Sequence, residues 1–466
     1  MRILLVANGF PPFSMYGTEV YTYNLARALQ TDGHTVHVFF PVDRGGPAHT
    51  TFDGIHGGIA FTAIDQPSLP FRDFRYHYND RAVVPVFVRL LQRFQPEVVH
   101  FTYVLHKLSA SLVTWTKRAG IPTVITLTDV HFMCQQGQLL DTNNEQCHGP
   151  EGGVRCTRVC AAIGHFPLDE VNLLPETAVV QDVWSPSYDS INPLVLRDRY
   201  LRTVLASADA IIAPTEWVGS KVIEWGIPSA LVRQAEFGID THLLRGYVRR
   251  PADHLRVGFI GQIVRHKGVH TLLAAFSACE SARAELKIYG DTHSPAAENL
   301  LREAARFTED PRIRFCGTFP PEEIGAVLGE IDVLVIPSIW HENSPLVLRN
   351  AIATATPVIV SAMEGMRPYV REMENGLLFE AGNVEDLRQT LQKVLDHPEL
   401  LDHFRTNPLP TTTIEEDAAR LSVLYVSLQG TGRSLDNSTA IDTAPTPDHE
   451  NRAAPSKSSE AQRITT

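Results

Sequence analysis

The sequence predicts an α/β protein built from two Rossmann-like domains, each a doubly wound parallel sheet, that face each other across a cleft. Two observations support this prediction. Short apolar runs typical of buried strands alternate with amphipathic segments at helical spacing, and this pattern runs through the chain twice. The chain also has 466 residues, which is more than one hydrophobic core usually supports.

The first domain is expected at residues 1–235. It opens with the apolar strand RILLVA, residues 2–7, and a loop rich in glycine and proline leads into a helix at residues 19–33. Later apolar runs, TVHVFF, VVHFTY, TVITLT and ADAIIAPT, are each expected to form a strand, and a further helix is expected at residues 108–120. Strands and helices that alternate in this way form parallel sheets with helices on both faces.

A second domain is expected at residues 255–429, because the same alternation restarts with the strand LRVGFIG at residues 255–261. Residues 236–254, whose periodicity is weak, are expected to link the two domains. The second domain is expected to end in an amphipathic helix at residues 413–429. The last stretch, residues 430–466, has no aromatic residue and is rich in Ser, Thr, Ala and Pro, so it predicts a disordered tail.

Composition and charge exclude several classes of function. The net charge of −12 argues against a nucleic-acid-binding protein, because such proteins present a basic face. No apolar stretch reaches transmembrane length, and the N-terminus predicts a strand and a turn rather than a signal peptide, so a cytosolic location is expected. One cluster of arginines is expected to form a solvated helix face, and a peripheral contact with a membrane is the alternative. The cluster consists of Arg72, Arg75, Arg81, Arg89 and Arg93.

The stretch SIWHENSPLVLRNAIATATPVIVS, residues 338–361, combines an acid with the start of a helix. Ser344 and Pro345 predict an N-cap followed by the first helical residue. Glu342 then lies just before the helix, and Asn350 lies within its first two turns. Unpaired N–H groups and the positive end of the helix dipole make such a place suitable for an anion. Taken alone, the stretch has an alternative interpretation as a solvated loop acid and a surface asparagine.

Two further motifs lie at the ends of expected strands, where an α/β sheet binds its ligands. The loop NGFPPFSMYGTE places Gly17 near the start of a helix, where a glycine lets the backbone approach a phosphate. In GFIGQIVRHKG, a strand ends at Gly261, and Arg265 and Lys267 follow before the next helix. Positive side chains there suit a diphosphate, although a charged surface turn is the alternative for this motif alone.

The motifs FPP…GTE, GFIGQIVRHKG and PSIWHENSPLVLRNAIATATPVI occur in an order and spacing that resemble the family 4 retaining glycosyltransferases of the GT-B fold. The resemblance covers nearly the whole chain up to about residue 430. It implies that Glu342 faces the sugar of a nucleotide-sugar donor and that Lys267 is the counter-charge of the diphosphate. It also implies that backbone groups of both domains hold this diphosphate. These groups belong to Ser344, Leu346 and Val347 and, in the first domain, to Gly17.

Four positions depart from the pattern of the resembled family. Asn350 stands where the family has a second glutamate that binds the ribose hydroxyls, and an amide can hydrogen-bond a hydroxyl but without the charge-assisted bond. Gln262 replaces a usual arginine, which moves neutralisation of the phosphates to the basic residues that follow it. Thr128 replaces a cleft histidine before Asp129, and Pro368 replaces a common glutamate.

The resemblance implies a retaining glycosyltransferase that needs no cofactor for transfer. The donor, a UDP-, GDP- or ADP-sugar, is expected in the second domain, where Gly261, Gln262 and Arg265 complete its site. The acceptor, a glycan, a lipid-linked glycan or a small molecule, is expected in the first domain. Two alternatives stay open: a degenerate GT-B protein that binds nucleotide or glycan without turnover, and a sugar-nucleotide epimerase on the same fold. The motif from Glu342 to Val347 favours transfer over epimerisation.

Four of the six cysteines lie close together in the sequence, with the spacing C-x12-C-x8-C-x3-C. In a cytosolic protein, four cysteines in a glycine-rich insert favour a metal site over disulfides. We therefore expect a structural zinc ion, with four free thiols as the alternative; a comparable insert occurs in a subset of the resembled family. The expected ligands are Cys134, Cys147, Cys156 and Cys160. Cys279 and Cys316 lie on apolar elements and are expected in the core.

Overall fold

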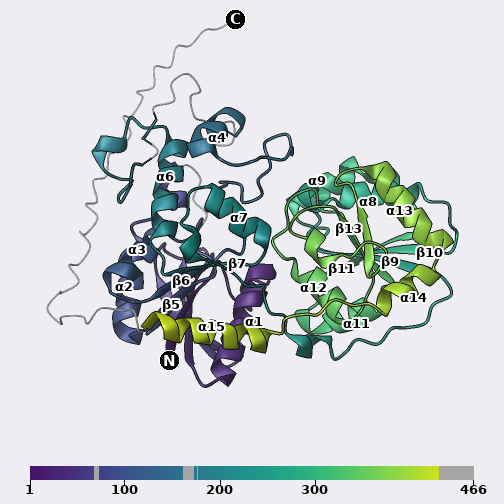
Figure 1. Cartoon of the computed structure of the whole chain (residues 1–466), viewed down its shortest axis with the longest axis horizontal. Helices are drawn as coiled ribbons and strands as arrows, with labels where there is room; N and C mark the ends of the chain where they lie inside the picture. The colour runs from purple at the N-terminus through teal and green to yellow at the C-terminus, as the bar shows by residue number, and fades with distance from the viewer. Residues whose placement is uncertain (68–72, 161–172, 176, 430–466) are drawn as a thin grey trace, which may run out of the picture.

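A computed structural model of the chain describes residues 1–67, 73–160, 173–175 and 177–429. Within this part the chain forms two α/β units, and each unit is built on one sheet with a hydrophobic cluster on either face (Figure 1). The predicted class, two parallel-sheet α/β domains, is confirmed. The predicted tail, residues 430–466, lies outside the described part.

The sheet of the first unit has eight described strands in the order β3-β4-β2-β1-β5-β6-β7-β8. Neighbouring strands are parallel except β3 and β4, which form an antiparallel hairpin at one edge. This hairpin was not expected from the sequence, because β3 is half exposed and lacks the apolar run of a buried strand. The strands are β1 (Arg2–Val6), β2 (Thr35–Val42), β3 (Thr51–His56), β4 (Ile59–Asp65), β5 (Val98–Phe101), β6 (Thr123–Thr126), β7 (Ala210–Ala213) and β8 (Val232–Gln234).

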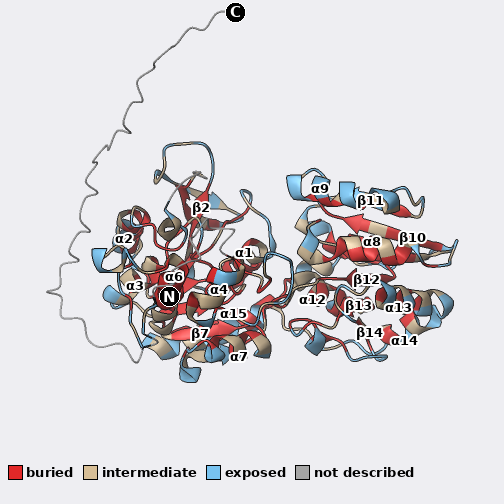
Figure 2. Ribbon diagram, turned by 90° about the horizontal axis from the view of Figure 1, so that it is seen from above, coloured by how far each residue is buried: buried red, intermediate tan, exposed pale blue. Residues whose placement is uncertain are grey.

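Alternate residues of the central strand β1 belong to two different cores. Leu4 and Val6 pack in the cluster on one face of the sheet, whereas Ile3 and Leu5 pack in the cluster on the other face. Because both faces are covered, the strand reads as a continuous apolar run rather than as an alternation. Figure 2 shows strands that are mostly buried, with the exposed residues on the helices and loops around them.

Two helices of the first unit, α6 and α7, begin at a side chain that caps them. The side chain of Asn192 accepts hydrogen bonds from the N–H groups of Leu194 and Val195, and Pro193 occupies the first helical position of α6. The helices are α1 (Gly17–Thr31), α2 (Val83–Phe94), α3 (Ser111–Arg118), α4 (Val154–Val159), α6 (Pro193–Ala206) and α7 (Glu216–Glu224).

The sheet of the second unit has six described strands, all parallel, in the order β11-β10-β9-β12-β13-β14. Because parallel strands end at the same edge, the loops that follow them gather there. Cys279 is buried as predicted, whereas Cys316, predicted in the core, is exposed on the edge strand β11. The strands are β9 (Leu255–Ile260), β10 (Ala284–Tyr289), β11 (Ile313–Gly317), β12 (Val333–Ile336), β13 (Val358–Ser361) and β14 (Gly376–Phe379). The helices are α8 (Val269–Ser277), α9 (Pro295–Glu303), α10 (Ala305–Thr308), α11 (Ile324–Gly329), α12 (Leu346–Ala353), α13 (Val384–Asp396) and α14 (Glu399–Arg405).

The last described helix, α15 (Ile414–Gln429), returns to the first unit, where it lies beside α1 (Figure 1). Its apolar residues join the core of that unit, and the hydroxyl of Tyr425 lies 2.6 Å from Nδ1 of the buried His100. The structure thus corrects the expected boundary, which assigned this helix to the second domain. Helical periodicity shows that one face of a helix is buried, but it does not show which sheet that face covers.

Acidic partners neutralise several of the arginines that suggested a contact with a membrane. The pairs are Arg75 with Asp73, Arg81 with Asp182 and Arg93 with Asp53. Arg72 lies outside the described residues. Of the helices in the described chain, none combines the length and the apolar character that a membrane crossing needs.

Candidate active site

The carboxylate of Glu342 lies buried in the loop between β12 and α12, and only 4% of the residue is exposed. Its Oε1 atom accepts hydrogen bonds from Nζ of Lys267 at 2.7 Å, Oγ of Ser338 at 2.6 Å and Nε1 of Trp340 at 3.0 Å. Its Oε2 atom has no hydrogen-bond partner among the described residues. The structure therefore brings two of the predicted site residues, Glu342 and Lys267, into direct contact, which was not predicted, and leaves one carboxylate oxygen free.

Lys267 keeps the buried acid ionised. Burial on its own would raise the pKa of Glu342, but the charge of Lys267 and the three hydrogen bonds together hold this pKa below its ordinary value. The ammonium group of Lys267 also lies over the ring of Trp340, 5.2 Å from the ring centroid. Because 23% of the Lys267 side chain is exposed, the ammonium borders both Glu342 and the solvent.

The loop that carries Glu342 packs tightly against the segment that follows β13. A Cβ on Gly365 would lie 1.4 Å from the backbone oxygen of Glu342, so this close approach requires a glycine. Ser344 has a left-handed φ of 59°, and its hydroxyl lies 3.0 Å from the hydroxyl of Tyr369. The expected N-cap is therefore displaced by one residue: Pro345 precedes the first turn of α12, and no side chain caps this helix.

The N-terminus of α12 offers unpaired backbone donors. Within the described chain, the N–H groups of Leu346 and Val347 have no hydrogen-bond acceptor. Asn350 lies one turn further along the helix, half-buried, and its side-chain amide has no partner in the described part either. Free N–H groups and the helix dipole, close to the ammonium of Lys267, suit a diphosphate.

Among the described residues, the other predicted site residues make no hydrogen bond or ion pair with the side chains of Glu342 and Lys267. Arg265 forms an ion pair with Glu303 at the end of α9, so its guanidinium is already engaged. Gln262 is exposed, and Gly261 directly follows β9. Gly17 is the exposed first residue of α1, and nothing lies within 4 Å of a Cβ placed there, so this position does not require a glycine.

Residues on either side of Glu342 connect the second domain to the first. Nδ2 of Asn343 donates to the backbone oxygen of Leu127, just after β6, over 2.5 Å. The ring of His341 stacks on Trp217 of α7 with the ring centroids 4.3 Å apart. The two domains are therefore in direct contact beside the buried acid.

The cysteine insert also contacts the second domain. Nε2 of Gln138 lies 3.2 Å from Nδ1 of His266, the neighbour of Lys267. Gln146 donates to the sulfur of Met363 at 3.4 Å. The insert thus takes part in the contact between the two domains.

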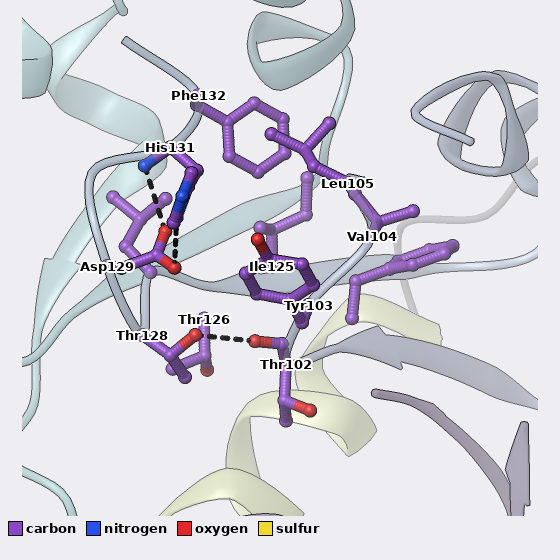
Figure 3. A pocket seen from close by; sticks show the side chains of 12 residues that line it. Thr102, Tyr103, Val104, Leu105, Ile125, Thr126, Thr128, Asp129, His131 and Phe132 are labelled. Atoms are coloured by element: carbon purple, nitrogen blue, oxygen red, sulfur yellow. Dashed lines mark hydrogen bonds and ion pairs between the residues drawn. The ribbon is translucent and has the colours of Figure 1, made fainter. Parts of the chain in front are cut away.

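A small pocket lies in the first domain where β5 and β6 end (Figure 3). Oδ2 of Asp129 lies 2.5 Å from Nδ1 of His131, and Oδ1 of Asp129 accepts the backbone N–H of His131 at 2.8 Å. The ring of His131 meets the ring of His106 edge-on, with centroids 4.5 Å apart. Leu127, which accepts the hydrogen bond of Asn343, also lines this pocket, so the pocket adjoins the loop that carries Glu342.

Sequence reasoning did not select several of the residues that complete these two sites. Ser338 and Trp340 hydrogen-bond Glu342 from its own loop, and Asn343 is its direct neighbour in the sequence. His131 follows Asp129 by two positions, a spacing at which a carboxylate can bind both the backbone and the ring of a histidine. That spacing was the signal in the sequence from which the pocket at Asp129 and His131 could have been found.

The four cysteines of the insert gather in one region but not at the spacing of metal ligands. All four are free thiols; Cys134 and Cys160 are buried, and Cys147 and Cys156 are half-buried. Burial, together with the nearby thiols of the other three, raises the pKa of Cys156. In the described chain, three or more potential ligand atoms lie within 4.8 Å of one another only at Asp240, His242 and Glu415. The zinc ion therefore stays a prediction.

Two family models match this chain. Residues 16–238 match the Glycosyl transferase 4-like domain, and residues 244–408 match the Glycosyl transferases group 1 family. The matches divide the chain at the predicted linker and together cover both units.

Curated relatives match over shorter stretches. The D-inositol 3-phosphate glycosyltransferase of Corynebacterium efficiens is 32% identical over 149 residues, which are 31% of this chain and 35% of the relative. The 2-deoxystreptamine glucosyltransferase of Streptomyces kanamyceticus is 29% identical over 142 residues, which are 30% of this chain and 36% of the relative. The matched stretches thus span about a third of the length of these relatives.

Solved structures share the fold over nearly the whole chain. The sucrose-phosphate synthase of Thermosynechococcus elongatus superposes with a TM-score of 0.66 at 19% identity and covers 92% of this chain and 100% of its own. Anabaena HepE in complex with UDP and glucose superposes with a TM-score of 0.59 at 14% identity and covers 92% of this chain and 98% of its own. At these identities the likeness establishes the fold alone, which is GT-B.

The stack between His341 and Trp217 predicts a dependence of stability on pH. Burial, with smaller effects of Lys221 and His148, lowers the pKa of His341 to about 4. Below the ordinary pKa of histidine, the unfolded chain therefore binds a proton at His341 that the folded chain excludes. The contribution of His341 to the stability of the fold is present above that ordinary pKa and is lost as the pH falls toward 4. His341→Phe retains a ring for stacking but has no group that titrates. Between about pH 7 and pH 5, we expect the free energy of unfolding of the wild type to fall by about 2 kcal/mol more than that of His341→Phe.

Urea denaturation at several pH values measures this difference. His293→Phe is the matched control, because His293 is exposed and its replacement should leave the pH dependence as it is in the wild type. The same pH dependence in His341→Phe and in the wild type would contradict the assignment.

Proposed function

Because this chain belongs to the GT-B glycosyltransferases, we propose that it transfers a sugar from a nucleotide-sugar donor to an acceptor with retention of the anomeric configuration. The observation that carries this proposal is the buried, ionised carboxylate of Glu342, paired with Lys267 beside the uncapped N-terminus of α12. This arrangement joins an acid that can face a sugar with donors that can hold a diphosphate.

In the proposed reaction, the donor diphosphate binds the N–H groups of Leu346 and Val347. Lys267 turns from Glu342 to the diphosphate, and together with the helix dipole it stabilises the charge that develops on the leaving group. Glu342 keeps its two other hydrogen bonds, and its free Oε2 atom faces the sugar. The role of Glu342 follows the family that the motif resembles.

Retention is proposed to follow the front-face route of the resembled family. The oxygen of an acceptor hydroxyl forms a bond to the anomeric carbon on the side from which the diphosphate departs. The bond between that carbon and the diphosphate oxygen breaks, and its electron pair leaves with the nucleotide. The hydroxyl proton passes to a diphosphate oxygen. The protein supplies positioning and charge stabilisation, and transfer requires no cofactor.

The donor and the acceptor are proposed by class. A UDP-sugar is the first candidate, because HepE, a structural neighbour, is described in complex with UDP-glucose; GDP- and ADP-sugars are the alternatives, and another neighbour, a starch synthase, is described with ADP. The acceptor is a glycan, a lipid-linked glycan or a small molecule, and the names of the two curated relatives support a small molecule. A cytosolic location, with or without a peripheral contact with a membrane, is part of this proposal.

A protein that binds a nucleotide without turnover is the second candidate. Two observations favour it: Asn350 replaces the second acid of the resembled family, and Gln262 is exposed where an arginine is usual. The ion pair between Glu342 and Lys267 favours turnover, because a buried charged group with a specific charged partner is typical of catalytic sites. The motif from Glu342 to Val347 also favours transfer over the epimerase alternative.

We also propose that the insert holds one structural zinc ion. Four thiols are a suitable donor set for a four-thiolate zinc site, and the ligands would be Cys134, Cys147, Cys156 and Cys160. The ion would fix the insert, whose Gln138 contacts the second domain.

The diphosphate assignment predicts different effects for two neighbouring cations. Lys267→Ala removes the counter-charge and should weaken the binding of UDP by roughly tenfold or more. Arg265→Ala is the matched control and should leave the affinity unchanged, because Arg265 is paired with Glu303. Isothermal titration calorimetry with UDP measures both variants. Equal UDP affinity in Lys267→Ala and the wild type would exclude Lys267 from the site.

Turnover is tested by Glu342→Gln, which keeps the shape of the side chain and removes its charge. We expect the rate of sugar release from the donor to fall roughly a hundredfold while UDP affinity changes little, because the acid acts on the transition state. A screen of nucleotide sugars by mass spectrometry identifies the donor and provides this rate. Undiminished turnover in the variant would exclude Glu342 from the reaction, whereas no turnover by the wild type with any nucleotide sugar would favour the second candidate function.

The zinc site is tested by elemental analysis of protein purified without added metal. About one zinc ion per chain is expected, as in other four-thiolate sites. Cys156→Ala should lose the metal, whereas Cys316→Ala should retain it because Cys316 lies on β11 in the other domain. Protein without metal, with four thiols that titrate freely, would identify the insert as a plain loop.

A further inference from the structure

Arg349 is a buried charge on α12, the helix whose N-terminus is proposed to hold the diphosphate. Only 1% of the residue is exposed. Its Nη2 atom lies 3.0 Å from Oε2 of Glu236, and its Nη1 atom donates to the hydroxyl of Tyr369 at 3.4 Å. A buried guanidinium is costly unless an opposite charge and hydrogen bonds compensate. The position of α12 therefore depends on the carboxylate of Glu236.

Glu236 lies where the chain passes between the two domains. Two interdomain segments, residues 236–254 and residues 406–413, run side by side there, and the N–H of Ile239 donates to the backbone oxygen of Thr412 at 3.1 Å. Oε2 of Glu236 accepts from the hydroxyl of Thr412 at 3.2 Å, and the backbone oxygen of Glu236 accepts from Arg420 of α15 at 2.6 Å. One residue thus joins both interdomain segments to α12.

Tyr369 extends these contacts to the loop of Glu342. The guanidinium of Arg349 can only donate, so the tyrosine oxygen accepts from it, and the tyrosine hydrogen can be donated to Oγ of Ser344, 3.0 Å away. Ser344 is buried and has a φ of 59°, which a serine rarely adopts unless its surroundings hold it. Ser344 lies two residues after Glu342 and two before the first residue of α12. The conformation of this loop is therefore tied to Arg349.

The first turn of α12 is also tied to the first domain. Leu346, whose N–H group is proposed to bind the diphosphate, packs its side chain against the core of the first unit. A rotation of the second domain about the two interdomain segments would change this contact and the ion pair of Glu236 with Arg349 together. The geometry of the proposed donor site therefore depends on how the two domains are placed.

We propose that Arg349 is a positioning residue: with Glu236 and Tyr369 it couples the two interdomain segments to the loop of Glu342, so that nucleotide binding and the placement of the domains depend on each other. The inference rests on the proposed function. Arg349 acts through Tyr369 and Ser344 and not on the donor itself, because it is buried and engaged with Glu236 and Tyr369. A nucleotide that fixes the loop also fixes the interdomain segments, and the reverse holds to the same extent.

A double-mutant cycle tests whether these residues act as one unit. Glu236→Gln removes the charge of an exposed side chain, and Tyr369→Phe removes one hydroxyl, so both variants should fold. Each should weaken the binding of UDP by about fivefold in isothermal titration calorimetry. The double variant should also be weakened by only about fivefold, because either change already breaks the connection, whereas independent effects would multiply to about 25-fold.

Two variants of matched chemistry are the controls. Glu415→Gln neutralises an acid at the start of α15 that pairs with His242, and Tyr289→Phe removes the hydroxyl of another buried tyrosine of the second domain. Both controls should bind UDP as the wild type does. Unchanged UDP affinity in either test variant, whatever its thermal stability, or a double variant weakened by the full product, overturns the inference.

Hydrogen exchange measures the same coupling at the interdomain segments. The N–H groups of Ile239 and Ile414 form hydrogen bonds between these segments. Saturating UDP should slow exchange in peptides that cover residues 236–244 and 409–416 by about twofold or more in the wild type. Tyr369→Phe should lose this slowing, although the removed hydroxyl contacts Ser344 and Arg349 rather than these segments. The same slowing in both proteins, or none in the wild type, overturns the inference.

Titration of the wild type with UDP separates this inference from the proposed function. If the wild type binds UDP and Lys267→Ala weakens that binding, the proposed donor site is supported, and unchanged affinity in Glu236→Gln or Tyr369→Phe then overturns this inference alone. No binding of UDP by the wild type contradicts the proposed function, and the inference falls with it.

Discussion

A buried carboxylate that must stay charged, that of Glu342, is the constraint on which the rest of the site depends. Removing such a group from water is costly unless an opposite charge and hydrogen bonds compensate. Lys267, Ser338 and Trp340 all compensate it through the same oxygen atom, which leaves the other oxygen for a ligand. The loop can present the group in this way because Gly365 lets a neighbouring segment pack against its backbone.

The same loop also connects the two domains, so the charge state of the site and the closure of the cleft are linked. His341 and Asn343, on either side of Glu342, contact the first domain through Trp217 and Leu127. Separation of the domains would break both contacts and admit water to the acid. In the proposed reaction, contact between the domains provides the dry surroundings in which fixed charges act most strongly on a departing diphosphate. The cysteine insert adds a further contact between the domains, next to the proposed donor site.

Local patterns of the sequence predicted the two sheets, and the family resemblance selected Glu342 and Lys267 separately, because each lies in a short motif. The apolar run of β1 shows that both faces are covered, and parallel strands necessarily bring the loops of Lys267 and Glu342 to one edge. Long-range contacts were not predictable in this way. The docking of α15 on α1 and the ion pair of Arg265 with Glu303 join distant segments, and periodicity or charge does not name the partner. The pair of Asp129 and His131 was readable from its spacing but had no motif to single it out.

The central claim is that the ion pair of Glu342 and Lys267 marks the donor site. The most direct test is to determine a crystal structure of this chain with UDP. If the buried ion pair marks the donor site, the diphosphate will lie within hydrogen-bond distance of the N–H groups of Leu346 and Val347. Nζ of Lys267 will have left Glu342 for a diphosphate oxygen, and Oε2 of Glu342 will border the space next to the terminal phosphate. UDP bound elsewhere, or bound at α12 while Lys267 remains on Glu342, would contradict the account.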